Sequence, residues 1–314
     1  MREIKSKKNN PFKKIFIKIC RIFGVELIDQ SNFSIPTSNK SINETLSMPG
    51  KNSITLPMGK VDITRPVKSL NIILRTCMSV NMLTQSKNRI FEKDKEQYTK
   101  RTLISLIKSV DCARDIFKEV KFKIHVIDHN SSKKQINDIK TILERSNLSF
   151  EILNLKFEEF SNLIENTNEE KKEVTNNQKS NMSNIHQSLV LSKEICEDLT
   201  YFVEDDYIHE KNSLTEMLFT YEKIASLTKK ELIICPTDYP FLYSQSEGTR
   251  IFLGDKKHWR QVDQTLCTFL TSKEIIERYW DQITSMCKFE HYPFEKPLHN
   301  IYKKELCISP IPSL

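Results

Sequence analysis

The stretch "TYFVEDDYIHE", residues 200–210, places three consecutive carboxylates, Glu204, Asp205 and Asp206, directly after a short apolar run. A short apolar run that ends at a polar cluster is typical of a buried strand. Side chains alternate along an extended segment, so we expect Glu204 and Asp206 to point one way and Asp205 the other. Two interpretations stay open here. The acids hold a cation, or they are solvated acids at the start of a helix, where the helix dipole favours them.

Strand and helix patterns alternate on the N-terminal side of this stretch. Apolar strand patterns occur at "LNIILRTC", "FKIHVIDHN" and "FEILNL", residues 70–77, 122–130 and 150–155, and helix patterns lie between them at residues 91–120 and 132–146. Alternation at this spacing predicts an α/β domain with a mostly parallel central sheet and helices on both faces, a Rossmann-like arrangement. We expect this domain to occupy residues 69–314.

The rest of that range predicts further elements. Residues 164–184 are polar and predict an exposed, flexible insertion, followed by a helix at residues 184–198. Ser213 and Glu216 have the spacing of a capping box at the start of another helix. Gly254 and Asp255 predict a hairpin turn in which glycine supplies a positive φ.

The first 24 residues carry all of the chain's excess charge. They hold eight Lys or Arg and one Glu, a balance of +7 that equals the net charge of the whole chain. "NPFKKIFIKICRIFG" puts Phe12, Ile15, Phe16, Ile19 and Phe23 on one helical face, opposite its basic residues. Residues 1–27 therefore predict a basic amphipathic helix, which either binds an anionic membrane surface or packs on its own domain. Residues 28–68 read as a linker with one or two short strands.

Bulk features exclude several classes of protein. The eight cysteines form no C-x-x-C pair, which argues against a zinc framework and a secreted disulfide scaffold and favours a cytoplasmic protein. No apolar run approaches the roughly 20 residues that span a bilayer, so any membrane contact is expected to be peripheral. Outside the first 24 residues the charge is balanced, and no basic stripe indicates a nucleic-acid partner.

The acidic cluster is placed where ligands bind in α/β proteins. In open α/β sheets, ligands sit outside the carboxyl ends of the strands. Hard carboxylate oxygens suit Mg²⁺ or Mn²⁺, and Mg²⁺ is commonly held by one or two carboxylates together with substrate phosphates. The second strand also ends in an acid, Asp128, followed by Asn130 and two serines. An Asp at that edge can accept hydrogen bonds from a base, although the same residues are also ordinary turn chemistry.

Taken together, strands ending in "LRTC", "VIDHNSS" and "FVEDDY" resemble the GT-A glycosyltransferases, in particular the family 2-like bacterial enzymes. The resemblance covers about residues 68–314 and implies a GT-A fold and a nucleotide-sugar donor, with a UDP-sugar expected. In that family a D-x-D motif holds a divalent cation that bridges the two phosphates of the donor. The acceptor is expected to be a glycan or a lipid-linked molecule in the synthesis of a surface polysaccharide or glycolipid.

Carried over by residue, the resemblance places Asp206 on the metal, with Asp205 as a second ligand or acting through water. Glu204 stands where the first acid of D-x-D approaches the ribose or the metal. The nucleotide pocket is implied for Arg75, Thr76, Asp128 and Asn130. For the additional histidine ligand of many GT-A enzymes, the candidates are His291 and His299.

An inverting transfer needs a carboxylate that takes the proton of the acceptor hydroxyl. Asp238, in "PTDYP" after the strand that follows the acidic cluster, is the first candidate, and Asp263 is the second. Two other classes remain open. One is a sugar nucleotidyltransferase, which is disfavoured because a Gly-rich loop is expected near its first strand and the chain has only five Gly. The other is a noncatalytic membrane-surface scaffold with the same fold.

Overall fold

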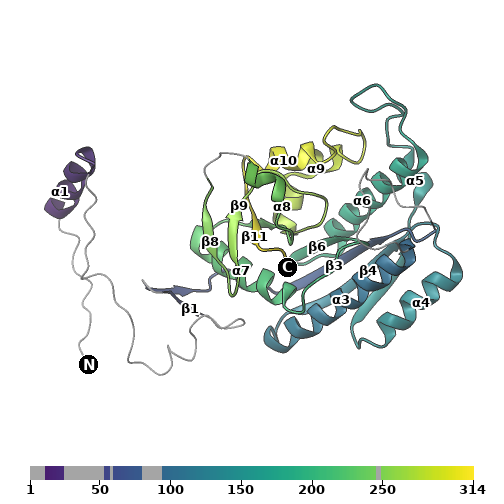
Figure 1. Ribbon diagram of the computed structural model, residues 1–314, viewed down its shortest axis with the longest axis horizontal. Helices are drawn as coiled ribbons and strands as arrows, with labels where there is room; N and C mark the ends of the chain where they lie inside the picture. The colour runs from purple at the N-terminus through teal and green to yellow at the C-terminus, as the bar shows by residue number, and fades with distance from the viewer. Residues whose placement is uncertain (1–10, 25–52, 57–58, 80–93, 245–248) are drawn as a thin grey trace.

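The computed structural model describes residues 11–24, 53–56, 59–79, 94–244 and 249–314 of the chain (Figure 1). Within those ranges, nine strands form one sheet in the order β5-β4-β3-β6-β10-β7-β11-β9-β8. These strands are β3 (Ser69–Thr76), β4 (Lys121–Asp128), β5 (Ser149–Asn154), β6 (Leu199–Glu204), β7 (Leu232–Ile234), β8 (Ile251–Leu253), β9 (His258–Gln261), β10 (Phe269–Ser272) and β11 (Leu306–Ile311).

The N-terminal half of this sheet is wholly parallel, because β5, β4, β3 and β6 pair in the same direction. The C-terminal half is mixed. Strand β10 lies between β6 and β7 and runs antiparallel to both, whereas β11 is parallel to β7. Strand β10 therefore begins at the edge where β6 ends, so the residues just before Phe269 lie near the acidic cluster.

Helices cover both faces of the sheet, and this confirms the predicted α/β architecture (Figure 1). Alternating residues of β3 divide the core, since Ile72 and Leu74 pack on one face and Ile73 on the other. The first face is covered by α3 (Lys95–Ile116), α4 (Lys133–Glu144) and α7 (Ser213–Thr228). The second is covered by α6 (Asn176–Ile195), α8 (Lys273–Arg278), α9 (Trp280–Ser285) and α10 (Lys296–Tyr302). A short α5 (Phe157–Ser161) and a 3₁₀ helix, η2 (Pro240–Ser244), complete the described domain.

The polar insertion expected at residues 164–184 is shorter than predicted, because α6 already begins at Asn176. Thr175 caps this helix in a capping box with Gln178. The first turns of α6 are polar because they face the ends of the strands, where Asn184 donates to the carbonyl of Ile127. Helical order here comes from these tertiary contacts, and apolar periodicity alone did not reveal it.

The predicted capping box of Ser213 and Glu216 is wrong. The N-cap of α7 is Asn212, and the carboxylate of Glu216 is instead buried under the β8–β9 hairpin. It accepts hydrogen bonds from the Trp259 indole at 3.0 Å and from the backbone N–H of Lys256 at 2.8 Å. The hairpin across Gly254 is confirmed, but its φ is not in the left-handed region. Glycine is needed because an added Cβ would lie 2.1 Å from a Glu216 oxygen.

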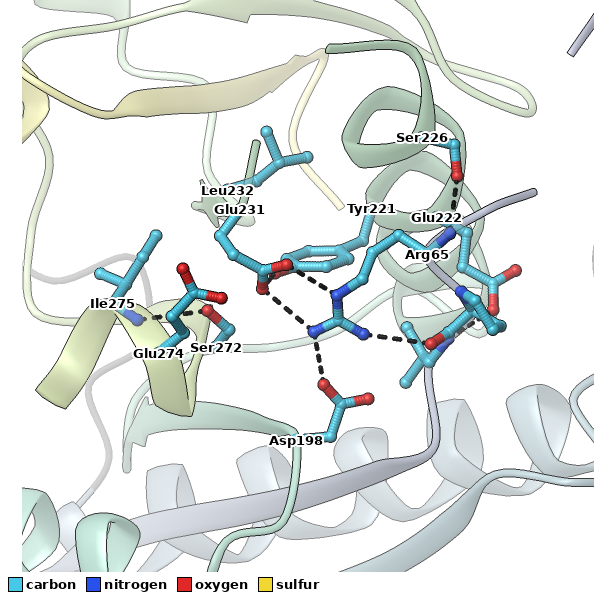
Figure 2. A network of polar contacts seen from close by, with 12 residues as sticks. Arg65, Asp198, Tyr221, Glu222, Ser226, Glu231, Leu232, Ser272, Glu274 and Ile275 are labelled. Carbon is cyan, nitrogen blue, oxygen red and sulfur yellow. Dashed lines mark hydrogen bonds and ion pairs between the residues drawn. The ribbon is translucent and has the colours of Figure 1, made fainter. Parts of the chain in front are cut away.

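The domain includes residues before the predicted boundary at residue 69. Val67 is buried in the core, and Arg65 forms ion pairs with Asp198 and Glu231 at the end of the sheet opposite the acidic cluster. Figure 2 shows the Arg65 guanidinium between these two carboxylates, beside the ring of Tyr221. The chain entering β3 is thereby tied to the segments that lead into β6 and β7.

The predicted N-terminal helix is described as α1 (Pro11–Ile22), and Figure 1 shows it apart from the sheet. Its apolar residues, including Phe12, Phe16 and Phe23, are exposed. The expected strands of the linker occur as an antiparallel pair, β1 (Ser53–Leu56) and β2 (Gly59–Asp62). Residues 1–10 and 25–27 of the predicted N-terminal helix lie outside the described residues. So do linker residues 28–52 and 57–58 and the start of the predicted helix at residues 91–93. None of the described helices combines the length and apolarity needed to cross a bilayer.

Candidate functional site

Four residues singled out from the sequence meet at one edge of the sheet. Arg75 is aligned with Glu204 across the β3–β6 pair, and Thr76 is aligned with Asp128 across the β3–β4 pair. Each stands at the carboxyl end of a parallel strand, because three apolar runs of similar length end in polar residues at the same level. This is the edge at which α/β sheets bind ligands.

Glu204 and Arg75 form the centre of this edge. The Arg75 guanidinium is 6% exposed, with Nη2 3.3 Å from Glu204 Oε1 and Nη1 3.3 Å from Asn181 Oδ1. The other oxygen of Glu204 accepts from the Thr268 hydroxyl at 3.2 Å, just before β10. Nη2 of Arg75 is buried and makes no hydrogen bond with the described residues. A positive charge is therefore fixed at the strand ends with bonding capacity left over.

Asp205 and Asp206 differ in surroundings, as the expected alternation requires. Asp205 is buried against α3, where its Oδ2 accepts from Thr99 at 3.1 Å and from the Cys77 N–H at 3.3 Å. Its Oδ1 lies 3.5 Å from the Lys95 ammonium. Asp206 is exposed at the end of the strand. Asp205 is thus engaged in holding α3 and the residues after β3, while Asp206 faces solvent.

Asp128 shapes the turn after β4. It is buried, and its Oδ1 accepts from the hydroxyls of Thr76 at 2.7 Å and Ser131 at 2.6 Å. The next residues, His129 and Asn130, line a cavity of about 790 Å³ between β4, β5 and the start of α6. The His129 ring stacks on Phe157 in this cavity, with centroids 4.9 Å apart. Asp128 therefore positions the loop, and Asn130 is open to a ligand.

The two candidate bases lie in the C-terminal half of the domain, Asp238 after β7 and Asp263 after β9. Asp238 accepts from Arg260 at 2.9 Å through one oxygen and from the Tyr243 hydroxyl at 2.9 Å through the other. Asp263 lines a second cavity, of about 700 Å³, together with Tyr243 and Arg260. Asp238 is thus paired with Arg260, and Asp263 lines the same cavity as that arginine.

The candidate histidine ligands are also apart from the acids that follow β6. His299 Nε2 lies 3.0 Å from the carbonyl of Thr265, and burial lowers the pKa of this imidazole. His291 packs edge-on against Phe289. In the described part of the chain, no three His, Cys, Asp or Glu side chains are grouped so that they could hold a metal by themselves.

One residue that the sequence did not single out belongs to the site. Glu295, the N-cap residue of α10, is half-buried, and its Oε1 lies 3.9 Å from the Cys267 thiol. Burial raises the pKa of Glu295, and the nearby charge of Glu204 raises it further, while Arg75 acts in the opposite direction. The only local signal in the sequence is the Lys-Pro pair that follows Glu295 and starts the helix.

Comparisons with known proteins found similar solved structures but no matching family. No protein-family model matches the sequence, and no curated protein matches it. Among solved structures, the chain is similar to residues 1–349 of TarS from S. aureus, with 14% identity, a TM-score of 0.36, and coverage of 67% of this chain and 48% of that one. It is also similar to UDP-glucose pyrophosphorylase complexed with UDP-glucose, with 9% identity, a TM-score of 0.37, and coverage of 78% and 90%.

A third similar structure is an active-site mutant of LgtC, with 13% identity, a TM-score of 0.33, and coverage of 67% of this chain and 65% of that one. The chain thus spans about half the length of the TarS chain it matches. At TM-scores below 0.5 these likenesses carry no conclusion about activity, which has to be argued from the site.

Proposed function

We propose that the chain is a GT-A-like glycosyltransferase that moves a sugar from a nucleoside-diphosphate sugar, expected to be a UDP-sugar, to an acceptor hydroxyl. The observation that supports this most is the meeting of Arg75, Thr76, Asp128 and Glu204 at the carboxyl ends of adjacent strands. Asp206 stands exposed beside them. A fixed cation, an exposed carboxylate and a neighbouring cavity suit a ligand that carries both a base and a diphosphate.

Asp206 would hold Mg²⁺ or Mn²⁺ together with the phosphates of the donor. The residues fit such an ion chemically. Among the residues that the structure describes, the site offers carboxylate oxygens but no closed set of protein ligands. Mg²⁺ usually takes one or two carboxylates and completes its shell from phosphates and water. When bound, the ion stabilises the charge that develops on the leaving diphosphate. Glu204 is proposed to face the ribose, oriented by Thr268 and Arg75. Asn130 is proposed to line the pocket of the base.

Calorimetry with UDP tests the site directly. We expect UDP to bind more tightly when Mn²⁺ is present, and Asp206→Ala to weaken this Mn²⁺-assisted binding at least tenfold. The matched control is Asp115→Ala, because Asp115 is an exposed acid on α3 whose ion pair, with Lys118 just beyond the helix at 3.7 Å, is exposed as well. Equal UDP affinity with and without Mn²⁺, unchanged in Asp206→Ala, would contradict the proposal.

Turnover assays then separate the classes of function. We expect slow hydrolysis of at least one donor in a panel of UDP, GDP, CMP and dTDP sugars. Release of pyrophosphate from a sugar 1-phosphate and UTP would instead indicate a sugar nucleotidyltransferase. A protein that turns over no donor and is insensitive to Asp206→Ala would indicate a scaffold.

We also propose that the enzyme works at the cytoplasmic face of a membrane, on a glycan or lipid-linked acceptor. The support is α1 and the residue that follows it, whose side chains Phe12, Ile15, Phe16, Ile19, Ile22 and Phe23 are between 45% and 80% exposed. Residues 1–24 carry a balance of +7. Interfacial helices combine apolar burial with attraction to anionic lipid, at about 1 kcal/mol for each basic residue near the surface. Charge complementarity therefore favours anionic lipid over a protein partner for this face.

Flotation of the full chain with vesicles tests this part. We expect binding to phosphatidylserine-containing vesicles, little binding to pure phosphatidylcholine, and loss of binding in Phe16→Asp. Leu227→Asp is the matched control, since Leu227 is an apolar side chain of similar exposure on α7. Equal flotation of Phe16→Asp and the wild type would show that α1 does not bind the membrane.

A further inference from the structure

We propose that Glu295 is the general base of the transfer, the group that takes the proton from the acceptor hydroxyl. This inference rests on the proposed glycosyltransferase function and names a catalytic residue for it. It differs from the two candidates predicted from the sequence, Asp238 and Asp263.

The reversed direction of β10 brings Glu295 to the site. Because β10 is antiparallel to β6, the residues that precede it lie at the edge where β6 ends. Thr268 donates to Glu204 at 3.2 Å, and the adjacent Cys267 lies 3.9 Å from Glu295. The start of β10 thus bridges the acidic cluster and the start of α10. Glu295 as a residue is half-buried at this edge.

The surroundings of Glu295 make its carboxylate a stronger base than an ordinary glutamate. Glu295 lies within electrostatic range of both Glu204 and Arg75, which act on it in opposite directions. Burial and Glu204 favour the protonated carboxyl, and they raise its pKa above the usual value for Glu. A general base is most effective when its proton affinity matches the working pH. Arg75 keeps the ionised form accessible.

Asp238 is poorly suited to the same task. Both of its oxygens are engaged, one by Arg260 and the other by Tyr243. Its ion pair with Arg260 is largely buried, and protonation would leave that arginine unpaired. Among the described residues, no cation is paired directly with the Glu295 carboxylate, which accepts from its own backbone N–H and lies 3.9 Å from the Cys267 thiol.

The step balances without a further reactant. The oxygen of the acceptor hydroxyl forms a bond to C1 of the donor sugar. The bond from C1 to the diphosphate oxygen breaks, and its electron pair leaves with the nucleoside diphosphate. The hydroxyl proton passes to a Glu295 carboxylate oxygen and then to solvent. Because the acceptor attacks opposite the leaving group, the configuration at C1 inverts.

Hydrolysis of UDP-glucose, UDP-galactose and UDP-N-acetylglucosamine tests the role with water as the acceptor. For the donor that the wild type hydrolyses best, we expect Glu295→Gln to lower kcat by about 10²- to 10⁴-fold. The Kd for UDP should stay within twofold, and the fall of the rate toward acid pH should disappear from the residual activity. Product analysis by NMR should show an inverted anomer. The control is Glu277→Gln, at an exposed acid on α8.

The outcomes distinguish this inference from the proposed function. Hydrolysis unaffected by Glu295→Gln, retention at C1, or a large loss in Asp238→Asn instead would overturn the role of Glu295 while leaving the glycosyltransferase proposal intact. A wild type that binds UDP but hydrolyses none of the three donors would also overturn it. A wild type that binds neither UDP nor a nucleotide sugar would refute both proposals. Unchanged thermal midpoints would show that Glu295→Gln is folded.

Discussion

Replacing Arg65 with Ala would remove a cation that lies between two carboxylates at the base of the sheet. Arg65 Nη2 lies 2.5 Å from Asp198 Oδ1, and Nε lies 2.7 Å from Glu231 Oε1 (Figure 2). The side chains of Asp198 and Glu231 are only 6% and 11% exposed, so neither is well solvated by water. We expect Arg65→Ala to destabilise the domain without altering the ligand-binding edge.

The magnitude follows from burial and from the partners that remain. Removing one member of a fully buried ion pair costs about 3–5 kcal/mol. Arg65 is 25% exposed, so water enters the space it leaves. The Lys68 N–H and the Tyr221 hydroxyl also keep donating to the two carboxylates. We therefore expect a loss of about 2–3 kcal/mol in the free energy of unfolding, starting from the buried-pair value. In a domain of this size that corresponds to a fall in Tm of roughly 5–10 °C.

Urea unfolding followed by tryptophan fluorescence at pH 7.5 measures this loss, because Trp259 is buried in the core. The matched control is Arg114→Ala, which removes an exposed arginine 3.7 Å from Asp111. We expect the control to change stability by less than about 0.5 kcal/mol, as is usual for exposed pairs.

The pH dependence of the stability loss in Arg65→Ala tests whether the loss comes from the carboxylate that Arg65 pairs with. Burial alone would raise the pKa of Glu231, but hydrogen bonds from Arg65 and Tyr221 outweigh it and hold the pKa below its usual value. A lowered folded pKa contributes stability above the unfolded pKa of about 4.3 and loses it as the pH falls through the folded pKa. Without Arg65 the pKa of Glu231 should rise, so the stability deficit of Arg65→Ala should be full at pH 7.5 and should shrink as the pH falls through that raised pKa. A loss below 1 kcal/mol, or one independent of pH, would refute the reasoning.

Three further outcomes are expected. Burial raises the pKa of Glu222 to about 7, so its contribution to stability is present below pH 4.5 and is lost as the pH rises toward 7. In urea titrations, the free energy of unfolding of Glu222→Gln should therefore change less with pH over that window than that of the wild type. Gly254→Ala should lower the free energy of unfolding by about 2 kcal/mol or more, measured in urea, because the added Cβ overlaps the buried Glu216 carboxylate. Arg75→Gln should move the acid limb of the rate profile to higher pH, because Glu295 loses the cation that favours its ionised form; an unmoved limb would contradict this coupling.

The parallel half of the sheet could be predicted from the sequence because its strands follow local sequence patterns. Strands β3, β4 and β6 are apolar runs that end in polar residues, and Thr76, Asp128 and Glu204 mark those ends in the sequence as in the structure. Their meeting at one edge follows from the rule that parallel strands share a carboxyl edge. The side-chain alternation through Asp205 was likewise predictable.

Other parts depend on partners far away in the chain. Asp205 accepts a hydrogen bond from Thr99, which lies 106 positions earlier in the chain. No local sequence pattern predicts this contact. Glu216 has the spacing of a capping residue, but its carboxylate accepts a hydrogen bond from Trp259 in the distant β8–β9 hairpin. Glu295 reaches the site only because β10 is reversed, and short strands do not reveal their direction in the sequence.

The reversed β10 also has a consequence for synthesis on the ribosome. Strand β6 can pair with β3 as soon as it emerges, but its other edge stays open until β10 follows much later. Until then β6, which is largely apolar, presents a row of unpaired backbone N–H and C=O groups, and such open strand edges are sites of misassembly in nascent chains. A ribosome stalled between residues 205 and 268 should therefore carry an intermediate that depends on chaperones, and release of residues 269–272 should end that dependence.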